Sequence, residues 1–187
     1  MGATGDGAAP VLYPRLLNKM IGAKFKVIPG YATGGLRLAV ENGELDGICG
    51  IAWETHMAST PAWILGDKVR FLAQLGLTES KHMRGVPLAI DRIGNKEDRQ
   101  VFELLGIPQE FGRPYFGPPD VPAERLAALQ SAFDATLGDE AFLADAERAR
   151  QFVDPLSHKE IELLLARAYG APEAVIRAAA GFVSGAR

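Results

Sequence analysis

The sequence predicts an α/β fold with a mostly parallel sheet, followed by a helical C-terminal segment. Over residues 1–112, short apolar runs of strand character alternate with segments of helical periodicity. The joints between them are short and rich in glycine, which is typical of parallel strands linked by helices. Beyond residue 117 only the helical periodicity continues.

The first helix is expected over residues 8–21, where apolar residues recur at helical spacing. Gly22 should end it, because glycine readily adopts the left-handed conformation that closes a helix. The same reasoning predicts helices over residues 33–42, 53–65 with a break at Pro61, and 98–105.

Strands are expected where polar and apolar residues alternate, or where a short apolar run is bounded by glycine. These patterns occur at residues 24–28, 47–51 and 69–75, and residues 111–116 should be extended. Residues 78–84 are polar and should form a loop.

A boundary is predicted near residues 113–119, between an α/β lobe over residues 1–112 and a tail over residues 113–187. Helical stripes in the tail cover residues 122–137, 142–150, 157–169 and 172–183. These amphipathic helices must bury their apolar faces on the first lobe or on a partner.

The composition excludes several classes of protein. The 187 residues include 20 Lys+Arg against 23 Asp+Glu, a net charge of −3, so bulk charge does not hold this chain to nucleic acid. The single cysteine, Cys49, excludes a disulfide framework within the chain. The given start has neither a secretion signal nor a membrane span, so the chain taken as it stands would be cytoplasmic.

Signatures of catalysis are lacking, and no catalytic residue, metal site or cofactor is predicted. The sequence has no nucleophile elbow, no zinc-protease motif and no phosphate loop. An apolar context favours Cys49 as a small buried hydrophobe over a nucleophile. An enzyme that uses Cys49, or Glu44 with Asp46, remains the alternative from another class.

The glycine-rich start is the first candidate binding loop. It carries Ala3, Thr4, Gly5 and Gly7 directly before a predicted helix. Free backbone N–H groups and the dipole at a helix start favour a carboxylate or phosphate. The alternative is that Thr4 or Asp6 simply caps the helix.

A second loop of the same kind carries Tyr31, Thr33, Gly34 and Gly35. The second loop follows a predicted strand, and both helix starts would lie at the carboxyl edge of one parallel sheet, where ligands bind in such folds. Tyr31 would supply a flat apolar wall, and Trp53 would line the same edge or pack in the core. The two loops together predict a site for a small anion.

These residues, in this order, resemble the receptors of the tripartite tricarboxylate transporter family, also called Bug-type solute-binding proteins. The matching features are the Gly-Ala-Thr-Gly loop at residues 2–5, the strand-like 24–28 leading into Gly30-Tyr31, and the segment 38–47. Residues 86–88 and 117–129 with Phe133 resemble the family's return crossing and its helix. The resemblance covers nearly the whole chain.

The resemblance implies a two-lobed periplasmic binding protein of type II that closes on a small carboxylate. Residues 1–112 would be its second lobe, and the tail would pack on a first lobe whose initial half has no counterpart here. The chain would therefore be the C-terminal portion of a receptor. It further implies a periplasmic location and membrane transporter subunits as partners.

The leading prediction is thus a non-enzymatic protein that binds a small organic acid or amino acid. Backbone amides of residues 3–7 and 33–35 would hold the ligand, with the hydroxyls of Thr4 and Thr33. A third possibility is an interaction domain that forms a homodimer through the tail helices.

Overall fold

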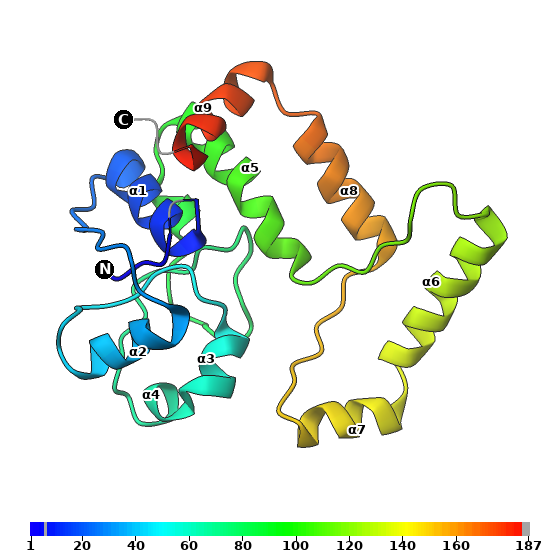
Figure 1. Ribbon diagram of the computed structural model, residues 1–187. Helices are drawn as coiled ribbons and strands as arrows, with labels where there is room; N and C mark the ends of the chain where they lie inside the picture. The colour runs from blue at the N-terminus through cyan, green and yellow to red at the C-terminus, as the bar shows by residue number, and fades with distance from the viewer. Residues whose placement is uncertain (6, 185–187) are drawn as a thin grey trace.

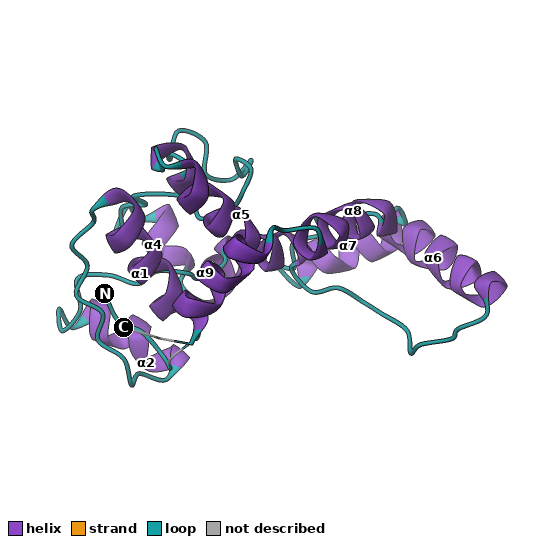
Figure 2. Cartoon of the chain, turned by 90° about the horizontal axis from the view of Figure 1, so that it is seen from above, coloured by secondary structure: helices purple, strands orange, loops and turns teal. Residues whose placement is uncertain are grey.

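The computed structural model describes residues 1–5 and 7–184, which form a helical body and a projecting arm. The body holds α1 to α5, a short 3-10 helix and α9 (Figure 1). The arm holds α6, α7 and α8, which extend away from the body when the molecule is seen from above (Figure 2). The chain therefore leaves the body after α5 and returns to it with α9.

The predicted helices are confirmed, most of them with shifts of a few residues at their ends. The helix expected over residues 98–105 is longer and includes Phe111, which was expected to be extended, and the 3-10 helix was not predicted. In the body they are α1 (Ala9–Ile21), α2 (Thr33–Glu41), α3 (Trp53–Ser59), α4 (Pro61–Leu65), the 3-10 helix η1 (Ala89–Arg92), α5 (Lys96–Phe111) and α9 (Glu173–Val183). In the arm they are α6 (Ala123–Leu137), α7 (Glu140–Arg148) and α8 (His158–Tyr169). Gly22 ends α1 in the left-handed conformation, and Pro61 begins α4 after a break.

The predicted α/β fold with a mostly parallel sheet is wrong, because the described part of the chain is all-helical and contains no sheet. Parallel pairing there is limited to three isolated bridges, Gly2 with Ile28, Gly2 with Ile48, and Gln74 with Leu88. A strand needs consecutive pairs along a neighbour, and alternation in the sequence does not supply that neighbour. Pro29 and Gly30 follow the Ile28 bridge directly, and both residue types weaken a ladder.

The core of the body lies between α1, η1 and α5. Tyr13 and Leu16 of α1 pack with Ile90 and Phe102, and the rings of Tyr13 and Phe102 meet edge to face at 6.0 Å. Cys49 packs against the same cluster. Removal of these side chains from water is the main force that holds the body together.

The last helix completes the body. Val175 and Ala179 of α9 are buried against Val101 of α5, and α9 also contacts α1. The tail helices thus differ in their environment, since α9 is packed while α6, α7 and α8 contain no buried residue. The predicted boundary near residues 113–119 stays a prediction about domains.

Two contacts tie the segment after α7 to the body. The Lys81 ammonium lies 3.0 Å from a carboxylate oxygen of Asp154. The rings of His82 and Phe152 meet edge to face at 5.5 Å. Both contacts come from the loop predicted over residues 78–84, which therefore holds the segment between α7 and α8 against the body.

Among the described residues, no helix combines the length and the apolar character that crossing a membrane requires.

Candidate functional site

The first residues of the chain bring the two predicted binding loops together. Ala3 donates its backbone N–H to the carbonyl of Ile28 at 2.9 Å and accepts from Tyr31 at 3.2 Å. The carbonyl of Thr4 accepts from the N–H of Gly30 at 2.9 Å. The loops that open α1 and α2 therefore lie side by side without the sheet that was expected to align them.

Among the described residues, no side chain caps the start of α1. The N-cap is Ala8, which has an extended backbone and no side-chain hydrogen bond. Thr4 is half-buried, while Gly5 and Gly7 are exposed. Asp6, the other proposed cap, lies outside the described residues.

The second loop leaves α2 uncapped as well. Its N-cap is Ala32, again extended and without a side-chain hydrogen bond. Leu36 is the first residue whose N–H bonds back to the Ala32 carbonyl, at 3.1 Å. The N–H groups of Thr33, Gly34 and Gly35 precede it in the first turn, where a helix offers no internal acceptor. Thr33 and Gly34 are exposed, and Gly35 is half-buried.

The two predicted aromatic residues have different surroundings. Tyr31 packs against the small cluster of Leu36, Ala39 and Leu45, beside the second loop. The ring of Trp53 stacks on His82 at 5.8 Å and also contacts Phe71 at 5.6 Å. The structure thus brings Tyr31 to the paired loops and places Trp53 in a second aromatic group.

That second aromatic group links α3 and α4 to the segment between α7 and α8. His56 contacts the rings of Trp63 and Phe71, and the Trp63 indole N–H donates to Glu41 Oε1 at 2.8 Å. Burial first, and the Arg37 guanidinium second, lower the pKa of His56. This imidazole is therefore held in its neutral form more strongly than a free histidine.

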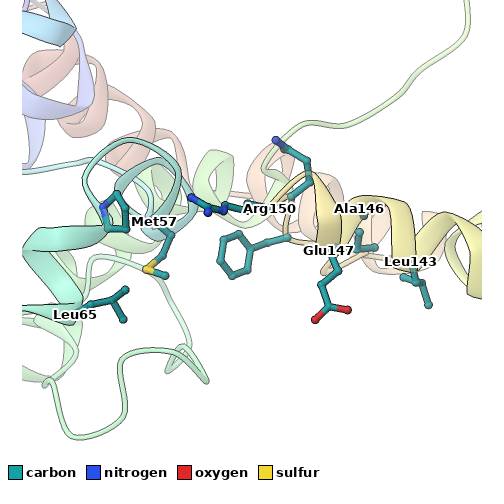
Figure 3. Close-up of a pocket in the computed structure, with 10 residues that line it drawn as sticks. Met57, Leu65, Leu143, Ala146, Glu147 and Arg150 are labelled. Atoms are coloured by element: carbon teal, nitrogen blue, oxygen red, sulfur yellow. The ribbon is translucent and has the colours of Figure 1, made fainter.

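A pocket of about 550 Å³ lies beside this group, between the body and the end of α7 (Figure 3). Met57, Pro61 and Leu65 form one wall. The opposite side consists of Leu143, Ala146, Glu147, Arg150, Gln151, Phe152 and Val153. Sequence patterns could not reveal this site, because its two walls are far apart along the chain.

The candidate catalytic groups of the alternative enzyme are poorly placed for chemistry. Burial raises the pKa of the Cys49 thiol to about 12, although a hydrogen bond with the Gly50 backbone acts in the opposite direction. A thiol with this pKa supplies almost no thiolate near neutral pH. Glu44 and Asp46 are exposed, and no three acidic, histidine or cysteine side chains among the described residues could hold a metal ion together.

The chain was compared with protein families, with curated proteins and with solved structures. No protein family, no curated protein and no solved structure matches it.

Proposed function

We propose that this chain is a non-enzymatic solute-binding protein that holds a small organic acid or amino acid at its two paired loops. The observation that carries the proposal is the backbone pairing of residues 3–4 with residues 28–31, which joins two helix starts at which no described side chain provides a cap. Helix starts of this kind favour carboxylates. The mild negative net charge of the chain is no obstacle, since the site needs no lysine or arginine.

The first turn of α2 would supply most of the donors. The N–H groups of Thr33, Gly34 and Gly35 and the Thr33 hydroxyl lie at its exposed start. The N–H groups of Gly30 and Tyr31 are excluded as donors, because they already bond to Thr4 and Ala3. Each charge-assisted hydrogen bond contributes about 1.5–3 kcal/mol, so two or three of them would hold a small acid.

The wider role proposed here follows the resemblance to the tripartite tricarboxylate receptors. The chain would bind its acid in the periplasm and deliver it to membrane subunits of a transporter of that type. The ordered motifs from the loop at residues 2–5 to the segment at 117–129 support this role.

A proline scan of the α2 start tests the site. Thr33 is the first helical residue, and the preceding Ala32 has the extended backbone, φ −72 and ψ 153, that proline requires before it. Thr33→Pro should therefore remove one N–H donor and the hydroxyl while the helix remains intact. Thr33→Ala, the matched control, removes the hydroxyl alone.

The readout is the melting temperature of the full chain with citrate, succinate, malate and glutamate at millimolar concentration. At least one acid should raise the melting temperature, and Thr33→Pro should weaken its binding by roughly tenfold relative to Thr33→Ala. A panel without any stabilising acid would contradict the proposal. Equal binding by the two variants would also exclude the α2 start as the site.

A second candidate function is supported by the arm. No residue of α6, α7 or α8 is buried, and Leu129, Phe133 and Leu163 are 61%, 41% and 66% exposed. Apolar side chains left exposed in this way are typical of helices that pack on a partner. A homodimer through these helices is the proposed form, and Phe133→Glu should convert it to a monomer in sedimentation experiments. A wild-type chain that is monomeric at high concentration would exclude this function.

A further inference from the structure

The pocket between the body and α7 is distinct from the paired loops. Its volume of about 550 Å³ falls in the range of roughly 300–1,000 Å³ that small-molecule sites occupy. Met57, Pro61 and Leu65 face it from the body, and Leu143 and Phe152 face it from the arm. A ligand would therefore contact both the body and the arm.

The apolar walls of this pocket remain open to water. Leu65 is 77% exposed, and Leu143 and Phe152 are 40% and 38% exposed. The wall on the arm side is held in place, because Phe152 contacts His82 and the neighbouring Asp154 pairs with Lys81. An apolar molecule of suitable size would bury these side chains on a partly preformed surface.

One cation borders the pocket at the end of α7. Arg150 has a φ of +55, a left-handed conformation that is uncommon for residues other than glycine. Two backbone hydrogen bonds hold this turn, from Arg150 to the Glu147 carbonyl at 2.9 Å and from Gln151 to the Ala146 carbonyl at 2.8 Å. The arginine is thus fixed at a position where glycine is common, which points to a role for its side chain.

The Arg150 side chain extends toward Met57, whereas the Glu147 carboxylate points away from it (Figure 3). Within residues 1–5 and 7–184, no ion pair or side-chain hydrogen bond engages the Arg150 guanidinium. Its neighbour Arg148, by contrast, pairs with Asp145. An available guanidinium next to open apolar walls favours a ligand that has both an anionic and an apolar part.

We propose that this pocket binds a small amphiphilic carboxylate, with the carboxylate on Arg150 and the hydrocarbon part between Leu65 and Phe152. This ligand class differs from that of the paired loops. A polar acid such as citrate would leave the apolar walls uncovered, and a hydrocarbon chain has no place at exposed backbone amides.

Intrinsic tryptophan fluorescence gives a direct readout. The sequence has two tryptophans. Trp63 lies on α4 between the lining residues Pro61 and Leu65, and Trp53 stacks on His82, which contacts Phe152. Titration of the full chain with decanoate, below its micelle concentration, should give a saturable change that fits one site. 1-Decanol, which has the same chain without the charge, should bind more weakly.

Arg150→Gln should weaken decanoate binding by roughly tenfold or more, and Arg150→Lys should restore part of it. Arg148→Gln is the matched control and should leave the affinity within about twofold of wild type. Leu65→Asn should weaken decanoate and decanol alike, which tests the apolar wall independently of the charge.

Several outcomes would overturn the proposal. These are a fluorescence change that does not saturate, equal affinity in wild type and Arg150→Gln, or an equal loss in Arg148→Gln. Thr33→Pro separates this site from the paired loops, because it should leave decanoate binding unchanged. The decanoate titration can therefore succeed when the acid panel fails, and the acid panel can succeed when the decanoate titration fails.

Discussion

Cys49 illustrates how burial determines the chemistry of a single side chain. It packs beside the core of the body, and burial raises the pKa of its thiol to about 12. We expect iodoacetamide to modify Cys49 slowly near neutral pH in the native chain and rapidly in denaturant, where the thiol regains an ordinary pKa. Mass spectrometry after timed alkylation measures both rates. Rapid native modification would show an accessible thiolate and favour the enzyme alternative.

The same residue makes folding stability depend on pH at the alkaline end. The pKa of Cys49 is 9.0 in its ordinary state and about 12 in the fold, so the native chain binds more protons between these values. Stability should therefore fall as pH rises above about 9, by at most about 1.4 kcal/mol per pH unit for this group. Burial also raises the pKa of Tyr13, which adds to the loss at higher pH. Urea unfolding at roughly pH 8 and pH 10.5 tests this, and Cys49→Ala should flatten the profile.

Gly50 is the residue at which backbone conformation and close packing coincide. Its φ is +72, and a Cβ there would lie 2.8 Å from the carbonyl carbon of Ala9 at the start of α1. Gly50→Ala should lower the free energy of unfolding by more than about 1 kcal/mol, because both the conformation and the contact are unfavourable for alanine. Gly94→Ala is a suitable control, since a Cβ at Gly94 meets nothing within 4 Å. Equal stability of the two variants in urea would contradict this account.

At the scale of elements, α8 depends strongly on its first turn. Ser157 accepts a hydrogen bond from the Glu160 N–H at 3.3 Å, and the Ser157 N–H donates to the Glu160 carboxylate at 2.7 Å. Because α8 buries none of its residues, this reciprocal cap is a large part of what stabilises it. The Ser157 hydroxyl, which donates to the Glu160 carboxylate at 2.7 Å, and secondly the Ser157 N–H lower the pKa of Glu160.

Ser157→Ala should therefore destabilise α8 locally by about 1 kcal/mol. Amide exchange should accelerate in the first turns of α8 and change little in α1, which does not touch this cap. Ser157→Thr retains the hydroxyl and should preserve most of the protection. Unchanged exchange in α8 would mean that tertiary contacts, and not the cap, maintain the helix.

Helices and strands differ in how far the sequence predicts them. The helices could be predicted because their signals are local, such as Gly22 at the end of α1 and Pro61 at the start of α4. The absence of a sheet from the described residues could not be predicted, since strand pairing depends on partners remote in the sequence, and Ile28 and Ile48 each meet Gly2 at only one position. The two binding loops do adjoin, but through backbone hydrogen bonds of residues 3–4 with residues 28–31 and not through the expected sheet. The pocket beside Arg150 has no local pattern in the sequence, because its walls come from distant segments.

At the scale of the whole molecule, the body and the arm differ in how their apolar surface is covered. The body surrounds Phe102 and Leu16, which are fully buried. The arm helices α6 and α7 contact each other but bury no residue. Local stability follows the burial of apolar contacts, so it should be much lower in the arm.

Hydrogen exchange of the full chain should therefore show fast exchange over residues 123–148 and slow exchange in α1 and α5. A dimer through the arm would slow the exchange of residues 123–148 as protein concentration rises. Slow exchange there in a dilute monomer would contradict the exposed arm.

The contact of α9 with α5 and α1 bears on how the chain is synthesised. On the ribosome, α5 emerges before the whole of α6, α7 and α8, and α9 follows only after them. During that interval the apolar side chains of α5 that later meet α9, such as Val101, lack the cover that α9 provides. The core of the body should therefore be completed late in translation, and the nascent chain should expose this apolar surface until α9 arrives.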